Sequence, residues 1–332
     1  MLKIGVIGIG MMGNMHLNCY SILSKEFNIE IAAIADIDPE KVKEAVAKFG
    51  GKGYSSGEEL IANADVDLID ITLPTYLHAE HAIMAMERGR HVMVEKPVAR
   101  TAEQGEAMLA AQKKAGVQVM VGHCIRHWNG YVVLKEMIDS GKYGKVKSAV
   151  FNRLSPAPTW GWENWLRTTE KSGGCALDMH IHDVDYVRYV FGDPVSFHSD
   201  ACYAGDNEPV HIVTNFRYPD KMVSMEGVWD YKGKFPFEMK YRINFEDASV
   251  TFSTLDNLVH VYTDDEEQVI DLNDDGVGSS DVGGNISDLG GYYNELKYLL
   301  SCLTNGKPVE IANLADSVES LKLVLKCIES TR

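Results

Sequence analysis

The sequence predicts an α/β domain built on a parallel, doubly wound sheet, followed by an α+β domain with a large, mostly antiparallel sheet. Three observations lead to this prediction. Strand and helix patterns alternate through the first third of the chain, a glycine-rich turn follows the first strand pattern, and long runs of strand type replace the alternation after about residue 145. Alternating strands and helices indicate βαβ units, whereas consecutive strands joined by turns indicate antiparallel pairing.

Short apolar runs of strand type lie at residues 3–7, 29–35, 66–72, 91–94 and 118–121. Segments with a helical spacing of apolar residues separate them, at 39–49, 78–88 and 101–115. In the second part of the chain we expect strands at 210–218, 222–231, 237–245 and 249–254, and helices at 176–191, 289–304 and 314–330. We place the domain boundary after residue 123, which gives domains of residues 1–123 and 124–332.

The composition excludes several classes of partner. The chain of 332 residues has a formal net charge of −16, and an acidic chain repels phosphate backbones, so we expect no nucleic-acid partner. No apolar stretch approaches the roughly 20 residues that cross a bilayer, so we expect no membrane partner. The six cysteines include no C-x-x-C pair, which is typical of free thiols in a reducing compartment. These features predict a soluble, cytoplasmic protein.

A glycine motif follows the first predicted strand. Gly8, Gly10 and Gly13, with Met11 and Met12 between the last two, form G-x-G-x-x-G at the start of a helical segment. The first glycine permits a tight turn, the second lets the backbone approach a pyrophosphate, and the third lets helix and strand pack closely. The free N–H groups and the dipole of the helix favour an anion there. The motif predicts a Rossmann domain that binds a dinucleotide.

Asp36 ends the second predicted strand and is followed by Ile37. It lies about 20 residues beyond the glycine motif, where a carboxylate accepts hydrogen bonds from the ribose hydroxyls of the dinucleotide. Because this carboxylate would repel a 2′-phosphate, we expect NAD as the cofactor in preference to NADP. The alternative is that Asp36 only caps the turn that it forms with Asp38 and Pro39.

Glu95, Lys96 and Pro97 follow the strand pattern at 91–94. Ligands of parallel sheets bind outside the carboxyl ends of the strands, so we expect this lysine to point into the cofactor crevice. The alternative is a surface lysine, which is the usual location for that residue type.

A histidine–carboxylate pair is expected on the helix at 176–191. Asp178 and His182 are four residues apart, so their side chains are neighbours on one helix. A carboxylate beside an imidazole orients it and raises its basicity, as a general base requires. His180 lies away from this pair and is interpreted as a packed or hydrogen-bonded residue. We predict no metal, because the other histidines and cysteine nearby in sequence form no ligand set of the usual spacing: His123, Cys124 and His127.

Together these motifs resemble the Gfo/Idh/MocA oxidoreductase family, and most closely its inositol 2-dehydrogenase branch. The resemblance rests on the glycine motif, on the segment from Thr72 to His78, on Glu95-Lys96-Pro97, and on the segment from Gly173 to Asp185. The segments at 123–128 and 159–165 depart from the inositol enzymes, so the resemblance does not specify inositol as the substrate.

The resemblance implies an NAD-dependent enzyme that transfers a hydride to the nicotinamide from a secondary hydroxyl of a sugar, a sugar derivative or a cyclitol. It implies that Lys96 holds the reacting hydroxyl, that His182 takes the hydroxyl proton, and that Asp178 positions the substrate or His182. Further implied contacts are to the cofactor from Thr72, Pro74, His78, Glu95 and Lys96, and to the substrate from Arg126. Apart from the resemblance, we expect Trp162 and Trp165 to stack on a sugar ring, and we include His123 among the candidate substrate contacts.

The resemblance also implies a homodimer or homotetramer that forms through the sheet of the C-terminal domain. Two other functions stay open. One is an NAD-dependent, glycoside-processing enzyme that oxidises the sugar transiently, and the other is a non-catalytic NAD-binding regulator. The tryptophans have an alternative as well, because tryptophan commonly packs in protein cores.

Overall fold

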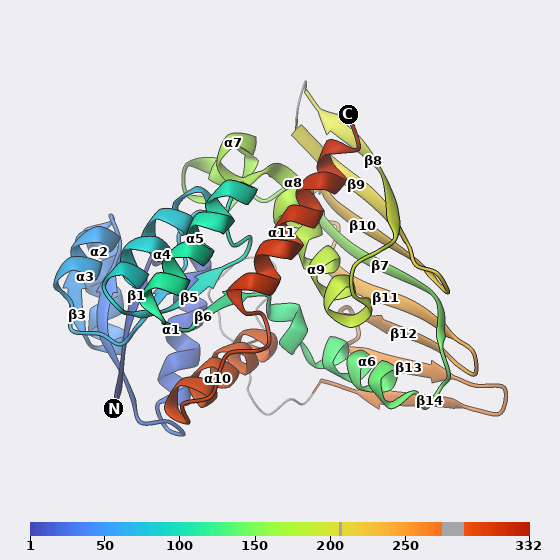
Figure 1. Ribbon diagram of the computed structural model, residues 1–332, viewed down its shortest axis with the longest axis horizontal. Helices are drawn as coiled ribbons and strands as arrows, with labels where there is room; N and C mark the ends of the chain where they lie inside the picture. Colours follow the sequence, from blue (N-terminus) through green and yellow to red (C-terminus); the bar gives the residue numbers. More distant parts are fainter. Residues whose placement is uncertain (206–207, 274–288) are drawn as a thin grey trace. The chain divides into compact units, whose positions relative to one another are not determined.

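The computed structural model describes residues 1–205, 208–273 and 289–332, and the chain divides into two compact units (Figure 1). The first unit comprises Met1–Cys124 with Ser279–Leu321, and the second comprises Ile125–Gly278 with Lys322–Arg332. A later segment of the chain, which ends at Leu321, therefore belongs to the first unit, whereas the predicted boundary after residue 123 assigns it to the second domain. The physical reason is packing, since α10 (Gly290–Thr304) lies against α1 (Met11–Leu23).

The first unit contains a six-stranded parallel sheet, which confirms the predicted doubly wound sheet. The strand order is β3-β2-β1-β4-β5-β6, so the direction of winding reverses between β1 and β4. Ligands of open α/β sheets bind at such a switch point, outside the carboxyl ends of the strands. The strands are β1 (Leu2–Ile7), β2 (Ile29–Ala35), β3 (Lys52–Tyr54), β4 (Leu68–Ile71), β5 (His91–Glu95) and β6 (Val119–Gly122).

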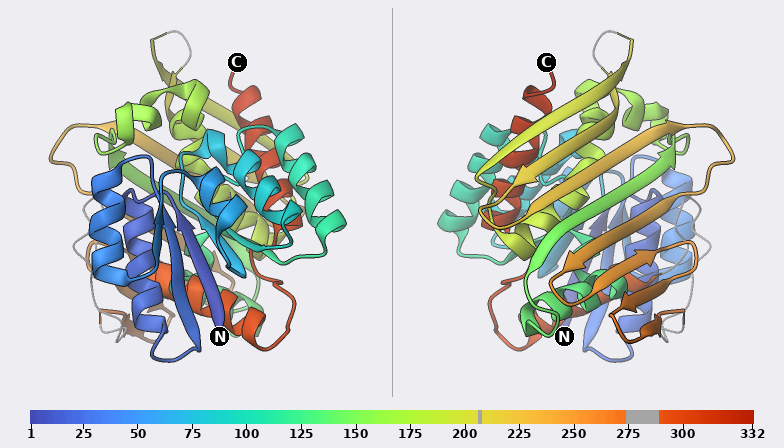
Figure 2. Two further views of the ribbon diagram at one scale, coloured as in Figure 1. Left: turned by 90° about the vertical axis from the view of Figure 1, so that its left-hand side faces the viewer. Right: turned by 90° about the vertical axis from the view of Figure 1, so that its right-hand side faces the viewer.

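Local capping explains where helices of the first unit begin. The side chain of Asp38 accepts a hydrogen bond from the Glu40 N–H at the start of α2 (Pro39–Phe49), whose first residue is a proline. Thr101 and Gln104 form a capping box at the start of α5 (Ala102–Ala115). Helices flank the parallel strands on both sides in the left-hand view of Figure 2. The other helical segments are α3 (Gly57–Asn63), η1 (Thr75–Leu77), α4 (His78–Glu87) and α11 (Leu314–Glu329).

The turn between β1 and α1 depends on a close backbone approach. A Cβ atom on Gly13 would lie 1.9 Å from the carbonyl oxygen of Gly8, so no other residue fits at position 13 without a shift of the backbone. Gly8 itself has a φ of +92°, in the region that favours glycine. Thr72, directly after β4, donates from Oγ1 to the Gly8 carbonyl at 2.7 Å. The glycine motif is thereby fixed against both β1 and β4.

The second unit contains an eight-stranded sheet in the order β14-β13-β12-β11-β7-β10-β9-β8. Neighbouring strands pair antiparallel except β7 and β10, which run parallel, so the expected mostly antiparallel sheet is confirmed. The strands are β7 (Val146–Pro156), β8 (Ser196–Ala204), β9 (Glu208–Arg217), β10 (Met222–Tyr231), β11 (Glu238–Phe245), β12 (Ser249–Ser253), β13 (Leu258–Tyr262) and β14 (Glu267–Asp271).

Helices α6 (Asn129–Ser140), α8 (Gly174–Asp178) and α9 (His180–Phe191) lie on one face of this sheet (Figure 1). Tyr131 on α6 (Asn129–Ser140) is central to the packing, with the ring of Tyr186 at 4.9 Å and that of Tyr241 at 5.5 Å, both edge-on. The hydroxyls of Tyr186 and Tyr241 donate to backbone carbonyls, so these buried polar ends are satisfied. The other helical segments are η2 (Cys124–His127), η3 (Trp162–Arg167), α7 (Thr169–Ser172), α8 (Gly174–Asp178) and α9 (His180–Phe191).

The expected single helix over 176–191 is wrong, because α8 and α9 are separated at Met179. The His182 N–H donates to the Met179 carbonyl at 3.3 Å, a tighter connection than the α-helical one. The interruption accompanies the burial of His180, whose Nε2 lies 2.8 Å from the hydroxyl of Thr214 on β9. Gly227 on β10 leaves room for the imidazole, since an added Cβ would lie 3.3 Å from the His180 Cβ. The interpretation of His180 as a packed, hydrogen-bonded residue is confirmed.

No disulfide joins the six cysteines, as their spacing predicted. All of them except Cys202 are buried. Within residues 1–205, 208–273 and 289–332, no helix has both the length and the apolar character that a membrane span requires.

The second and third glycines of the glycine turn should respond differently to replacement by alanine. Gly13→Ala should destabilise the protein by about 2 kcal/mol or more, because the new Cβ overlaps the Gly8 carbonyl. Gly10→Ala should change stability by less than about 1 kcal/mol, because its φ is −83° and an added Cβ meets no atom within 4 Å. Denaturant unfolding of both variants measures this difference. Equal losses would contradict the described turn.

Candidate functional site

The start of α1 borders open space. No side chain caps the helix at Gly10, and no acidic residue lies in the first turn. A Cβ on Gly10 would meet no atom within 4 Å, so the backbone at Gly10 is approachable at the positive end of the helix dipole, and Met11 and Met12 form the first turn that follows. A pyrophosphate needs both a close backbone approach and N–H donors. The turn therefore fits the phosphates of a dinucleotide.

Asp36 lies directly after β2 and is half-buried. Its Oδ2 accepts a hydrogen bond from the Ile9 N–H at 2.6 Å, and its Oδ1 accepts one from the Asp38 N–H at 2.9 Å. The carboxylate thus joins the glycine turn to the turn before α2, so the capping alternative describes part of its role. Ile37, beside it, is exposed.

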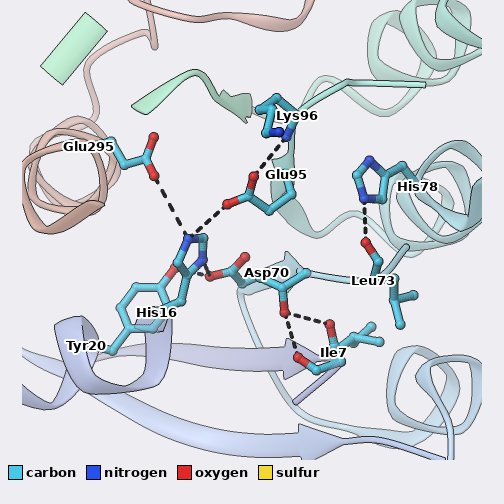
Figure 3. Close-up of polar contacts among 11 residues, drawn as sticks. Ile7, His16, Tyr20, Asp70, Leu73, His78, Glu95, Lys96 and Glu295 are labelled. Atoms are coloured by element: carbon cyan, nitrogen blue, oxygen red, sulfur yellow. Dashed lines mark hydrogen bonds and ion pairs between the residues drawn. The ribbon is translucent and has the colours of Figure 1, made fainter. Parts of the chain in front are cut away.

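The segment from Thr72 to His78 connects two turns at the carboxyl edge of the sheet. The ring nitrogens of His78 lie 2.8 Å from the Pro97 carbonyl and 2.7 Å from the Leu73 carbonyl (Figure 3 shows the second contact). Burial lowers the pKa of His78. The buried ring therefore holds the backbone beside Pro74 next to the backbone that follows Lys96. Its predicted contact with the cofactor stays a prediction.

Glu95 and Lys96 form the turn after β5. The Glu95 carboxylate is almost fully buried, and its Oε2 accepts the backbone N–H of Lys96 at 3.1 Å. Gly122 on β6 provides the space, because a Cβ there would lie 3.2 Å from the Glu95 carboxyl atoms. Lys96 is half-buried, and its place in the cofactor crevice stays a prediction.

A buried histidine lies behind this turn (Figure 3). Nδ1 of His16 on α1 lies 2.8 Å from a carboxylate oxygen of Asp70 on β4, and Nε2 lies 3.2 Å from Oε1 of Glu95. The hydroxyl of Tyr20 donates to the same oxygen of Asp70 at 2.8 Å. Burial opposes the charged ring, but the carboxylates of Asp70 and Glu95 outweigh it and raise the pKa of His16 well above its ordinary value. His16 is therefore an imidazolium between two carboxylates.

Sequence reasoning missed His16 and Asp70. A signal existed for His16, which lies three residues after Gly13 and so on the same face of the helix that follows the motif. Asp70 had a weaker signal, as one acidic residue inside an apolar strand run. Only the tertiary structure shows that the two side chains meet.

In the second unit, the expected pair of Asp178 and His182 is divided between two helices. Asp178 is the last residue of α8 and is half-buried, whereas His182 lies in the first turn of α9 and is 8% exposed. Met179 between the two helices keeps a right-handed helical backbone, with a φ of −88° and a ψ of −48°. The roles of both residues stay predictions.

Arg126 takes part in a buried ion pair. Its guanidinium donates to both carboxylate oxygens of Asp185 on α9, at 2.8 and 2.6 Å, and lies over the ring of Tyr189. The structure thus gives Arg126 a part in fixing α9, and its predicted contact with substrate stays untested. His123 and His127 beside it are buried. Burial, helped by the charge of Arg126, lowers the pKa of His127 to about 3, so that ring is neutral.

Trp162 at the start of η3 is exposed by 51%, so packing in a core does not account for it. Trp165, one turn later, is half-buried beside Gly161. Between the two tryptophans, Glu163 and Asn164 both have positive φ, at 49° and 55°. Non-glycine residues in that region are uncommon and cluster at functional sites.

Comparisons with known proteins agree with this geometry. Residues 2–123 match the model of an oxidoreductase family with an NAD-binding Rossmann fold, GFO_IDH_MocA. Residues 131–251 match the model of the GFO/IDH/MocA C-terminal domain. The solved structure of levoglucosan dehydrogenase with NADH and levoglucosan superposes with a TM-score of 0.86 at 24% identity, covering 99% of this chain and 97% of that one, which shows a shared fold.

Two curated relatives are similar over 58% of this chain each. Levoglucosan dehydrogenase of Pseudarthrobacter phenanthrenivorans is 32% identical over 204 residues, 58% of this chain and 52% of the relative. Myo-inositol 2-dehydrogenase of Thermotoga maritima is 31% identical over 195 residues, 58% of this chain and 56% of the relative. The chain spans about half the length of the curated relatives it matches. With both domain models of one family matched along most of its length, the chain belongs to the Gfo/Idh/MocA family of oxidoreductases, and its first domain is the family's NAD-binding Rossmann domain.

Proposed function

We propose that this protein is an NAD-dependent oxidoreductase that removes a hydride from a secondary hydroxyl of a sugar, a sugar derivative or a cyclitol. One observation carries the proposal. Lys96 follows β5, and the glycine turn follows β1, in a sheet where β1, β4 and β5 are parallel neighbours. Both turns therefore lie at the same carboxyl edge, which is where α/β sheets bind ligands.

The first unit supplies the cofactor contacts in this proposal. Backbone N–H groups at the start of α1 receive the pyrophosphate, and Asp36 receives the ribose hydroxyls, with Ile37 beside the adenosine. Thr72, Pro74, His78 and Glu95 maintain the edge of the sheet that Lys96 shares. When bound, NAD supplies the hydride acceptor that the reaction requires.

Lys96 and His182 perform the acid–base work in this proposal. A lysine ammonium donates hydrogen bonds and carries positive charge, so Lys96 can hold the hydroxyl oxygen and stabilise the negative charge that develops there. A neutral imidazole accepts a proton, so His182 takes the hydroxyl proton, and Asp178 orients His182 or the substrate. These roles rest on the family resemblance and on the surroundings of each residue within its own unit.

The substrate class rests on the relatives and on the second unit. The two relatives are named for levoglucosan and myo-inositol, an anhydro sugar and a cyclitol. The exposed ring of Trp162 offers a face on which a sugar ring can stack, with Trp165 nearby in sequence. We assign substrate binding to the second unit, and we keep His123 and Arg126 as proposed contributors to it.

We also propose a cytoplasmic location and a homodimer or homotetramer. The location is supported by six cysteines without a disulfide, as in a reducing compartment. The oligomer is supported by the sheet of the second unit, since α6, α8 and α9 all pack on the same face. The right-hand view of Figure 2 shows the opposite face of that sheet.

A screen of sugars, cyclitols and glycosides with purified protein and NAD tests the function, with NADH absorbance as the readout. A dehydrogenase accumulates NADH with one class of polyol. Conversion of a glycoside without net NADH would contradict the dehydrogenase proposal and favour transient oxidation. Binding of NAD with no conversion across the screen would favour a regulator.

The cofactor preference should depend on the charge of Asp36. The wild type should bind NAD more tightly than NADP, because the carboxylate repels a 2′-phosphate. Asp36→Asn keeps an oxygen that can accept the Ile9 N–H and removes the charge, so the preference for NAD should fall by ~10-fold or more. Calorimetric titration of both proteins with both cofactors measures this. Tighter binding of NADP by the wild type would disprove the role of Asp36.

Hydride transfer should depend on Lys96. Lys96→Met should lower kcat by ~100-fold or more and leave NAD affinity nearly unchanged, because the substitution removes the charge and the donor but keeps the length of the side chain. Lys113→Met, on the exposed side of α5, is the matched control and should have wild-type activity. Turnover by Lys96→Met at the rate of this control would remove Lys96 from the mechanism.

The pH dependence of kcat/KM should reflect the ionisation of His182. Oxidation requires a neutral imidazole, so kcat/KM should rise with pH as His182 loses its proton. His182→Ala should abolish this ionisation and most of the rate, whereas His198→Ala, at an exposed histidine on β8, should change neither. Initial rates across a pH series measure the effect. An unchanged profile for a folded His182→Ala protein would exclude His182 as the base.

A further inference from the structure

The first unit contains a buried group of four ionisable side chains behind the turn that carries Lys96 (Figure 3). Three of them are His16, Asp70 and Glu95, described above. The fourth is Glu295 on α10, a helix more than 170 residues beyond the others in sequence. Glu295 has an exposed fraction of 0%, and its Oε1 lies 3.9 Å from Nε2 of His16.

Glu295 also lies near Glu95. One side-chain ligand atom from each of His16, Glu95 and Glu295 can be chosen so that all three lie within 4.8 Å of one another. Neither carboxyl oxygen of Glu295 has a hydrogen-bond partner among residues 1–205, 208–273 and 289–332. Two carboxylates at this separation without a bridging proton repel each other strongly in a buried site.

The position of Glu295 is imposed by the packing of its helix. α10 lies against α1, and at its start Lys297 forms an ion pair with Glu26 at 2.7 Å, while the hydroxyl of Tyr293 donates to the same carboxylate. Glu295 lies between these two anchoring residues in sequence, on the buried side of the helix. The packing of α10 on α1 therefore encloses the carboxyl group of Glu295, which has no exposure to solvent.

The balance of charges in the cluster favours a state in which one of the three carboxyl groups is neutral. With Asp70, Glu95 and Glu295 all ionised, one imidazolium would face three buried anions, and an unpaired buried charge is costly. His16 is already closer to the other two carboxylates than to Glu295. The titratable groups that face Glu295 are His16, Cys19 and Tyr20 on α1, Asp70 on β4 and Glu95 on β5.

We propose that Glu295 holds a proton at neutral pH and acts as a positioning residue for Lys96. As a neutral acid it leaves the Glu95 carboxylate undisturbed between the His16 imidazolium on one side and the Lys96 N–H on the other. That carboxylate fixes the turn on which Lys96 stands. The inference about Lys96 rests on the proposed function, whereas the inference about the proton does not.

The electrostatic environment supports this assignment. Burial, followed by the negative charge of Glu95, raises the pKa of Glu295 well above its ordinary range, and the charge of His16 offsets this only in part. Burial also disfavours the ionised form of Glu95, but the adjacent imidazolium of His16 and the charge of Lys96 bring the pKa of Glu95 below its usual value. The two glutamates are thus held in opposite protonation states.

Glu295→Gln tests the proton without any substrate, because an amide has the shape and neutrality of the protonated acid. Unfolded glutamate loses its proton near ~4.3, while folded Glu295 keeps it, so the folded wild type binds one more proton than the unfolded chain and loses stability as pH rises above that value. The Tm of Glu295→Gln should therefore rise relative to wild type between about pH 5 and about pH 8. Glu87→Gln, at an exposed glutamate of α4, controls for the change in net charge.

Infrared spectroscopy gives a second, direct readout. The wild type at neutral pH should show a carbonyl band of a protonated carboxylic acid that disappears in Glu295→Gln and persists in Glu87→Gln. A Tm difference that does not vary with pH, together with no lost band, would overturn the assignment. So would failure of Glu295→Gln to fold, because a neutral acid can be replaced by its amide. A stoichiometric divalent cation that copurifies with wild type and is lost in Glu295→Gln would overturn it as well.

Activity then tests the positioning role. Glu295→Gln and Glu295→Leu are both neutral at this position, so each should retain kcat within about threefold of wild type. At alkaline pH, where Glu295 loses its proton, the kcat of the wild type should fall relative to that of Glu295→Gln. The same pH dependence of kcat in the wild type and in Glu295→Gln would refute the link to Lys96. This outcome would not affect the conclusion that Glu295 is protonated, which the infrared measurement tests independently.

Discussion

The ion pairs of His16 are the interaction on which the candidate site of the first unit depends. This one imidazolium joins α1, which opens with the glycine motif, to β4 through Asp70 and to β5 through Glu95. All three side chains are buried, so removal of one partner leaves an uncompensated charge, which typically costs about 3–5 kcal/mol. The glycine turn and the turn that carries Lys96 are thereby held by the same buried group, which is out of contact with solvent.

The second unit uses buried charge in a comparable way. α9 carries His182 near its start, and the next acidic residues along the helix form buried pairs with arginines: Asp183 with Arg153 on β7 and Asp185 with Arg126. Burial raises the pKa of Asp183, and the charge of Arg153 offsets this only in part. These pairs fix the rotation of α9 on the sheet, and the direction of the His182 side chain follows from that rotation. The sequence motifs associate Arg126 with substrate, and in the structure its guanidinium forms a buried ion pair with Asp185 on α9.

Sequence patterns predicted the parts of the fold that have strong local signals. The strand at 29–35 and the helix at 39–49 coincide with β2 and α2, because an apolar run and a capped, amphipathic segment each specify their own ends. β14 was missed because all of its residues are exposed or half-buried, and β7 because it carries the buried, charged Arg153 within an otherwise alternating pattern. The candidate residues at the glycine turn and Lys96 were predicted because the motifs that contain them are continuous in sequence. It was missed where distant segments meet, as at His16, Asp70 and Glu295, and the helix break at Met179 arises from packing of His180 on β9, which no local pattern reports.

The central claim is that this protein moves a hydride from a carbon that bears a hydroxyl group to a nicotinamide ring. Isotope transfer tests that claim most directly. A substrate found by the polyol screen, labelled with deuterium on the carbon that carries the reacting hydroxyl, would be incubated with the protein and NAD, and the reduced cofactor examined by mass spectrometry. The account predicts one deuterium on the nicotinamide ring of NADH, together with a slower initial rate for the labelled substrate if hydride transfer limits turnover. NADH that forms without deuterium would show that the hydride comes from elsewhere and would contradict the account.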